Sequence, residues 1–157
     1  MLVYRITHKS FSKELSATGT PGRWNSFGKK VIYCAESIAL AFLENMIRRQ
    51  GVGFNEDFKI MIIEIPDELK IATVNAGDIK DEWRDFKDYS ICQHLGDKWY
   101  DEGAVPVFKV PSAVLTSSFN YLINTMHPEF KKIILIETTD LVPTERIEEI
   151  LKRYTKK

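Results

Sequence analysis

The feature that most constrains the fold of this chain is a set of short apolar runs that do not alternate regularly with helical segments. The clearest run, Lys59–Ile65, is rich in β-branched residues and is closed by Pro66, a combination typical of a buried strand. Because strands and helices do not alternate regularly, the pattern favours an α+β fold over a doubly wound parallel sheet. The other segments that predict strands are Leu2–Ile6, Val31–Cys34, Ile71–Val74, Val105–Val110 and Lys132–Glu137.

Helices are indicated in three places. Ser37 is a good N-cap residue for a helix from Ile38 to about Arg49, a segment rich in Ala, Leu and Met. The polar segment Asp78–Gly96 is expected to be helical in part. Residues 143–154 are predicted to form an amphipathic helix, because apolar residues recur at helical spacing at Ile147, Ile150, Leu151 and Tyr154.

Pro106 predicts where one strand lies in the sheet. Proline has no backbone N–H to give to a neighbouring strand, so the strand that contains it is expected at an edge. The segment Ile71–Val74 is short and is expected to be a second edge strand.

The composition indicates one globular domain over residues 1–157 and excludes several other classes. The chain has 157 residues, 44% of them hydrophobic, which is enough for one sizeable core. Lys plus Arg (22) balances Asp plus Glu (22), so there is no basic surplus for direct nucleic-acid binding. No apolar stretch is long enough to span a bilayer, and the N-terminus lacks the apolar core of a signal peptide. We therefore expect a cytoplasmic location and no contact with a membrane.

Common motifs for metal, nucleotide or hydrolase chemistry do not occur. The three histidines lie too far apart in sequence to form a local metal motif, so no metal site is expected. There is no P-loop, no G-x-G-x-x-G fingerprint, and no G-x-S-x-G elbow around Ser112. Cys34 lies within an apolar run, and in a reducing compartment neither it nor Cys92 is expected to form a disulfide.

Glu44 is the most informative residue of the predicted helix. At about 100° per residue it shares a face with Leu40 and Ala41, so its carboxylate is expected to emerge from an apolar stripe. A less specific interpretation is an ion pair with Arg48, one turn further along a solvated edge. Helical periodicity leaves both interpretations open.

The segment Gly22–Arg23–Trp24–Asn25, followed by Gly28, places a guanidinium, an indole and an amide on one loop. Such a set could clamp a pyrophosphate and stack against a ring. The alternative is a turn in which Trp24 fills the core and Arg23 is a surface charge. Arg5 and Tyr33 lie on predicted strands, where an edge charge and a core tyrosine are the ordinary interpretations.

Taken in order along the chain, several motifs resemble the RES family. They are YRI with Arg5, GRWN with its following glycine, VIYCAES with Tyr33, LAFLEN with Glu44, LGDKW, and VFKVPSAVLTSSFNYLINTMHP. The last is the most specific, and the resemblance runs from Arg5 to about Pro128. The chain departs from the family pattern at Pro21, where a glycine is common, and at Thr125, where a proline is usual.

The resemblance implies an ADP-ribosyltransferase-like split β core with surrounding helices, and cleavage of the nicotinamide–ribose bond of NAD. NAD would be the substrate, with no tightly bound cofactor. The implied catalytic residues are Glu44, which would stabilise positive charge on the ribose, Arg5 on the phosphates or ribose, and Tyr33 at the nicotinamide. The implied substrate-binding residues are Arg23, Trp24, Asn25, Ser112 and Asn120, of which Ser112 and Asn120 would bind substrate or hold Glu44.

The acceptor decides which reaction the resemblance implies. Water would give an NAD glycohydrolase, inorganic phosphate an NAD phosphorylase, and a protein side chain an ADP-ribosyltransferase. A non-catalytic nucleotide-binding module is the alternative from another class. The family also implies a bacterial toxin–antitoxin pair, in which an Xre-like antitoxin forms a hetero-oligomer with the toxin and carries the DNA-binding part.

Overall fold

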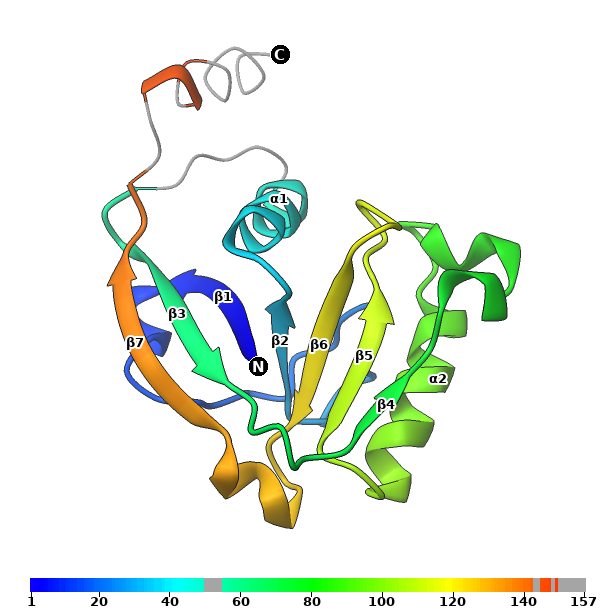
Figure 1. The fold of residues 1–157 in the computed structure, drawn as a ribbon. Helices are drawn as coiled ribbons and strands as arrows, with labels where there is room; N and C mark the ends of the chain where they lie inside the picture. Colours follow the sequence, from blue (N-terminus) through cyan, green and yellow to red (C-terminus); the bar gives the residue numbers. More distant parts are fainter. Residues whose placement is uncertain (50–54, 143–144, 148, 150–157) are drawn as a thin grey trace.

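The computed structural model describes residues 1–49, 55–142, 145–147 and 149. They form a seven-stranded sheet in the order β4-β5-β6-β2-β1-β3-β7, flanked by two α-helices (Figure 1). The strands are β1 (Leu2–His8), β2 (Val31–Ala35), β3 (Phe58–Glu64), β4 (Ile71–Thr73), β5 (Val107–Pro111), β6 (Phe119–Asn124) and β7 (Ile134–Asp140). The helices are α1 (Ile38–Arg48) and α2 (Ser90–Glu102), with 3-10 turns at Lys9–Phe11, Ala76–Asp78, Asp81–Arg84 and Pro128–Lys132. The expected α+β fold in one domain is confirmed.

The sheet is split between β1 and β2. These strands pair through a single residue pair, Tyr4 with Ala35, whereas β1 pairs with β3 along its whole length from Leu2 to His8. On the other side, β2 pairs with β6 from Val31 to Ala35. Two halves result, β1-β3-β7 and β4-β5-β6-β2, and one residue pair of β1 and β2 continues the strand pairing between them (Figure 1). The expectation of a split β core is therefore confirmed.

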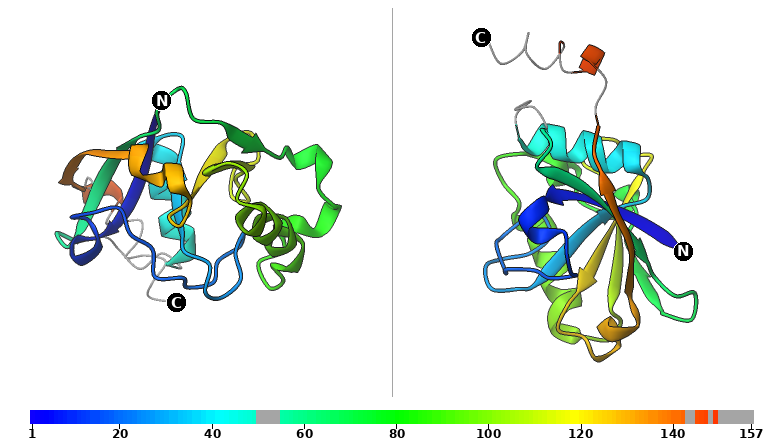
Figure 2. Two further views of the ribbon diagram at one scale, coloured as in Figure 1. Left: turned by 90° about the horizontal axis from the view of Figure 1, so that it is seen from below. Right: turned by 90° about the vertical axis from the view of Figure 1, so that its left-hand side faces the viewer.

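Each α-helix covers a different half of the sheet (Figure 2, left). Leu40 and Ala41 of α1 are buried with Ile6 of β1 and with Phe58 and Ile60 of β3. The second helix buries Cys92 and Trp99 against residues of β5 and β6, among them Phe108 and Leu122. A third cluster fills the opposite face of the sheet and joins the two halves through Val3, Ile32, Met61, Ile63, Tyr121 and Ile123.

The expected beginning of α1 is confirmed and the expected place of β5 is wrong. Ser37 caps α1, since its Oγ accepts a hydrogen bond from the N–H of Leu40 at 3.1 Å. β5 lies between β4 and β6, inside the sheet. Pro106 precedes the strand, and its carbonyl accepts from the N–H of Asn124. The missing N–H of Pro106 therefore removes no hydrogen bond between strands. The edge strands of the sheet are β4, as expected, and β7.

Several smaller expectations can also be placed. Cys34 is buried, as expected, and Cys92 is buried as well; both are free thiols. The segment Asp78–Gly96 is helical in part, with α2 continuing beyond it to Glu102. Most of the predicted helix over 143–154 lies outside the described residues. In the described part of the chain, no helix has the length and apolarity needed to cross a membrane.

Candidate active site around Glu44

Glu44 lies where α1 faces the other half of the sheet. Its Oε1 accepts two hydrogen bonds, one from Ser112 Oγ and one from Asn120 Nδ2, each 2.6 Å long. None of the ion pairs among the described residues includes Glu44, so the structure selects the inward orientation over the pair with Arg48. Two charge-stabilising donors on one oxygen fix the carboxylate in place.

The second carboxylate oxygen of Glu44 is available to a ligand. Within the described part of the chain, Oε2 accepts no hydrogen bond, and no fully buried side-chain oxygen there lacks a partner. Oε2 therefore reaches solvent, consistent with the half-buried state of the residue. One oxygen is anchored and the other is open, which is the arrangement expected of a carboxylate that acts on a bound molecule.

Ser112 is placed by the turn that follows β5. It is fully buried, and its Oγ accepts hydrogen bonds from the N–H groups of Val114 (3.1 Å) and Leu115 (3.0 Å). Its own proton is then directed to Glu44. Because every hydrogen-bonding position of this hydroxyl is used, Ser112 is suited to positioning Glu44 and not to nucleophilic attack.

Asn120 reaches the same carboxylate from β6. It pairs with Ala35 of β2 and with Val110 of β5, so three neighbouring strands fix its backbone position. The structure thus brings together three predicted site residues, Glu44, Ser112 and Asn120. Ser112 and Asn120 were expected either to bind substrate or to hold Glu44 in place, and these contacts support the second role.

Tyr33 and Asn25 form a second cluster. The Tyr33 hydroxyl donates to Asn25 Oδ1 at 2.5 Å and accepts from the N–H of Trp24 at 3.0 Å. Burial raises the pKa of this hydroxyl, so it remains protonated. Asn25 is itself buried, and its amide donates to the carbonyls of Thr20, Ser26 and Lys29. These bonds fold the loop into a fixed shape.

One face of α2 holds this loop in place. Residues spaced one turn apart on the helix contact it, and they include the glycine and aspartate of the LGDKW motif. Gly96 lies against the backbone of Trp24, and Asp97 accepts from the N–H of Ser26 at 2.9 Å. Gln93 donates to the carbonyls of Gly22 and Asn25. The sequence carried a signal for this contact, since a glycine inside a helix needs a packing reason.

Trp24 and Arg23, which were expected to bind substrate, both make contacts within the protein. The indole of Trp24 is 3% exposed and packs against Trp83 and Phe108. This burial contradicts the expectation that it stacks on a ligand ring, and the core-filling alternative is correct. Arg23 donates through Nη1 to the carbonyls of Trp83 (2.8 Å) and Asp85 (3.0 Å). Its contact with a pyrophosphate stays a prediction.

Arg5 is near the split but not bonded to Glu44. Its Nη1 donates to the carbonyl of Ser16 at 3.2 Å. Burial lowers the pKa of its guanidinium, and the positive charge of Arg48 acts in the same direction. A guanidinium that is partly desolvated and lies near a second cation favours the approach of an anion.

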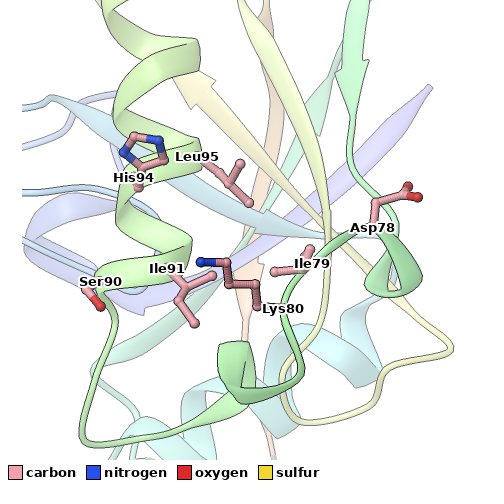
Figure 3. A pocket seen from close by; sticks show the side chains of 7 residues that line it. All are labelled: Asp78, Ile79, Lys80, Ser90, Ile91, His94 and Leu95. Carbon is pink, nitrogen blue, oxygen red and sulfur yellow. The ribbon is translucent and has the colours of Figure 1, made fainter.

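A separate hollow of about 360 Å³ lies beside α2 (Figure 3). The residues that line it include Ile79, Ile91 and Leu95 together with Lys80 and His94. It shares no residue with the clusters around Glu44 and Tyr33. The constellation of bonded polar groups at the split therefore marks the candidate site better than this hollow does.

Substituting Tyr33 by phenylalanine should lower the free energy of unfolding by about 1–3 kcal/mol. The substitution removes the hydroxyl that donates to Asn25 Oδ1 and accepts from the N–H of Trp24, so both groups lose their partner in a buried setting. Urea unfolding measures this loss. The matched control is Tyr121→Phe, because Tyr121 is a buried tyrosine whose hydroxyl makes no hydrogen bond within the described chain. Equal midpoints for the two variants would show that the Tyr33 hydroxyl does not hold the loop.

Comparison with known proteins relates this geometry to a family. The model of the RES domain matches residues 2–145. A protein of Pseudomonas putida named Toxin Res is 30% identical over 152 residues, covering 94% of this chain and 99% of its own length. A protein of a Sphingobium species named Prs ADP-ribosylating toxin is 31% identical over 125 residues, covering 76% of this chain and 78% of its own. The crystal structure of the M. tuberculosis MbcT–MbcA toxin–antitoxin complex contains a similar fold, with a TM-score of 0.75, 20% identity, and coverage of 96% of this chain and 88% of that one.

Proposed function

Because this chain belongs to the RES domain family, we propose that it is the toxin of a bacterial toxin–antitoxin pair and that it cleaves the nicotinamide–ribose bond of NAD. The observation that carries the proposal is the state of Glu44. One of its carboxylate oxygens is held by Ser112 and Asn120, and the other is open. NAD is the substrate in this proposal, and no tightly bound cofactor is required.

The chemistry requires a carboxylate of this kind. When the bond between ribose C1′ and the nicotinamide nitrogen breaks, the electron pair leaves with nicotinamide, and C1′ becomes part of an oxocarbenium ion. A fixed carboxylate next to that carbon stabilises the developing positive charge without having to reorganise. In the proposal, Oε2 of Glu44 faces the ribose, while Ser112 and Asn120 keep Oε1 from turning toward it.

The acceptor then attacks C1′. An oxygen of inorganic phosphate would form the new C1′–O bond and give ADP-ribose 1-phosphate, and a water molecule would give ADP-ribose after losing a proton. We favour these two acceptors. A second candidate, transfer of ADP-ribose to a protein side chain, is supported by the name of the Sphingobium relative, which is called an ADP-ribosylating toxin.

The proposal includes a protein partner. The similar fold in the MbcT–MbcA complex occurs with an antitoxin, and this supports an antitoxin partner for the present chain. An antitoxin of the Xre-like class, in a hetero-oligomer with this chain, is the partner that the resemblance to the RES family implies. The neutral formal charge of the chain gives it no surplus for contacting DNA, so we assign such contact to the partner. Both proteins would act in the cytoplasm, where NAD is found.

Purified protein incubated with NAD, with and without inorganic phosphate, tests the proposal. Nicotinamide release that requires phosphate is expected from a phosphorylase, and release in both buffers from a glycohydrolase. Labelled NAD added with a lysate should label protein only if ADP-ribosylation is the reaction. Expression of the chain alone should arrest growth as cellular NAD falls. A folded protein that releases no nicotinamide under any of these conditions would refute the enzymatic proposal.

A further inference from the structure

The 3-10 turn Asp81–Arg84 lies beside the turn that joins β5 to β6 (Figure 1). Arg84 connects the two turns, since its Nε donates a hydrogen bond to the carbonyl of Ala113 at 3.1 Å. The side chain of Arg84 is exposed, and none of the ion pairs among the described residues includes it. Its bond to a backbone carbonyl 29 residues away therefore ties two distant segments together.

The carbonyl that Arg84 binds belongs to the same peptide group as an N–H that binds Ser112. The peptide group between Ala113 and Val114 is trans, so its C=O and N–H point in opposite directions. The C=O accepts from Arg84, and the N–H donates to Ser112 Oγ at 3.1 Å. Arg84 thus sets the plane of the peptide group that orients the Ser112 hydroxyl, and this hydroxyl donates to Glu44 at 2.6 Å.

The backbone on either side of Arg84 is also fixed. Arg23 Nη1 donates to the carbonyls of Trp83 and Asp85, the two neighbours of Arg84 in the chain. The indole of Trp83 is buried and packs against Trp24. Arg84 therefore extends from a turn that is held in place by the side chains around it.

We propose that Arg84 is a positioning residue, which holds the Glu44 carboxylate in place through the turn that carries Ser112. The positive charge of the guanidinium strengthens its bond to the carbonyl, and hydrogen bonds in a chain polarise one another. The chain runs from Arg84 through one peptide group to the Ser112 hydroxyl and ends at Glu44. The inference rests on the proposed function for the reaction of Glu44, and on these bonds for the placement of its carboxylate.

Amide hydrogen exchange tests the positioning without relying on turnover. Arg84→Met, which keeps the length of the side chain but has no donor, should speed exchange of the Val114 N–H by about threefold or more. Arg84→Gln places an amide nitrogen where Nε was, so it should retain part of the protection. Lys87→Met is the matched control, since it removes an exposed positive charge three residues along the chain and should change exchange less than about twofold.

Steady-state rates of nicotinamide release connect this position to the reaction. Arg84→Met should lower kcat by about three- to tenfold and leave KM for NAD within about twofold, since Arg84 does not contact the substrate in this proposal. In the Glu44→Gln protein the same substitution should lower the remaining rate by less than about twofold, because no charged oxygen is left to misplace.

A purely structural role for Arg84 predicts the same fractional loss of rate in both backgrounds, and that result would overturn the inference. Unchanged exchange at Val114 in Arg84→Met would overturn it too, as would an unchanged kcat in an active enzyme. Faster exchange at Val114 in a protein that consumes no NAD would instead refute the proposed function. The placement of the Ser112 turn by Arg84 would still stand in that case.

Discussion

Replacing Glu44 with glutamine should slow NAD consumption by roughly 10²- to 10³-fold, the effect of losing one fixed electrostatic stabiliser of a transition state. The substitution preserves the shape of the side chain. The amide oxygen of the glutamine can still accept from Ser112 and Asn120, so its NH₂ group must take the place of Oε2. A neutral donor then faces the ribose where a negative charge is needed.

The rate of nicotinamide release measures this effect, and growth arrest on expression should be lost with it. Glu36→Gln is the control, because Glu36 is an exposed glutamate just before α1 and should retain its rate within about twofold. The free energy of unfolding of Glu44→Gln should stay within about 1 kcal/mol of wild type, since both hydrogen bonds persist. A folded Glu44→Gln protein with more than half of the wild-type rate would exclude Glu44 from the chemistry.

Replacing Gly96 with alanine should destabilise the fold by about 3 kcal/mol or more, at the upper end of overpacking effects. A Cβ at this position would lie 1.7 Å from the carbonyl oxygen of Trp24 and 2.7 Å from its carbonyl carbon. Both atoms belong to the backbone, so no rotation of a side chain relieves the clash. The loop cannot withdraw easily, because Gln93 and Asp97 bond it on either side of the contact.

Urea unfolding, or soluble yield where the variant does not fold, checks this expectation. The matched control is Gly77→Ala in a 3-10 turn, where a Cβ would meet nothing within 4 Å. Gly77→Ala should change the free energy of unfolding by less than about 1 kcal/mol. A Gly96→Ala protein as stable as Gly77→Ala would mean that α2 and the loop do not pack as closely as described.

The strands that the sequence predicted are those whose apolar residues are contiguous. β3 and α1 follow from a β-branched run and from a capping serine, which are local signals. β6 was not predicted as a strand because Asn120 and Asn124 interrupt its apolar pattern, and each is polar for a reason outside the strand. Asn120 bonds Glu44, and Asn124 accepts from the N–H of Met126 in the following turn.

The candidate site, too, could be predicted from the sequence only as far as local signals allowed. The apolar face of α1 indicated that Glu44 points inward, but its two partners lie 68 and 76 residues away in the chain. Only the pairing of β5 with β6 and of β6 with β2 brings those partners to the helix, and that pairing has no local signature. The resemblance to the RES family supplied Ser112 and Asn120, and physical reasoning from the sequence alone did not.

The single pair that joins β1 to β2 gives Glu44 a mechanical role. α1 packs mainly on β1 and β3 and also on Ala35 of β2, whereas Ser112 and Asn120 follow or belong to β5 and β6. The two hydrogen bonds of Glu44 therefore join the halves of the sheet on the α1 side, in addition to the pair of Tyr4 with Ala35 and the buried cluster on the opposite face. A displacement of one half relative to the other would strain these two bonds and move the charged oxygen. The orientation of the proposed catalytic carboxylate thus depends on how the two halves of the sheet pack together.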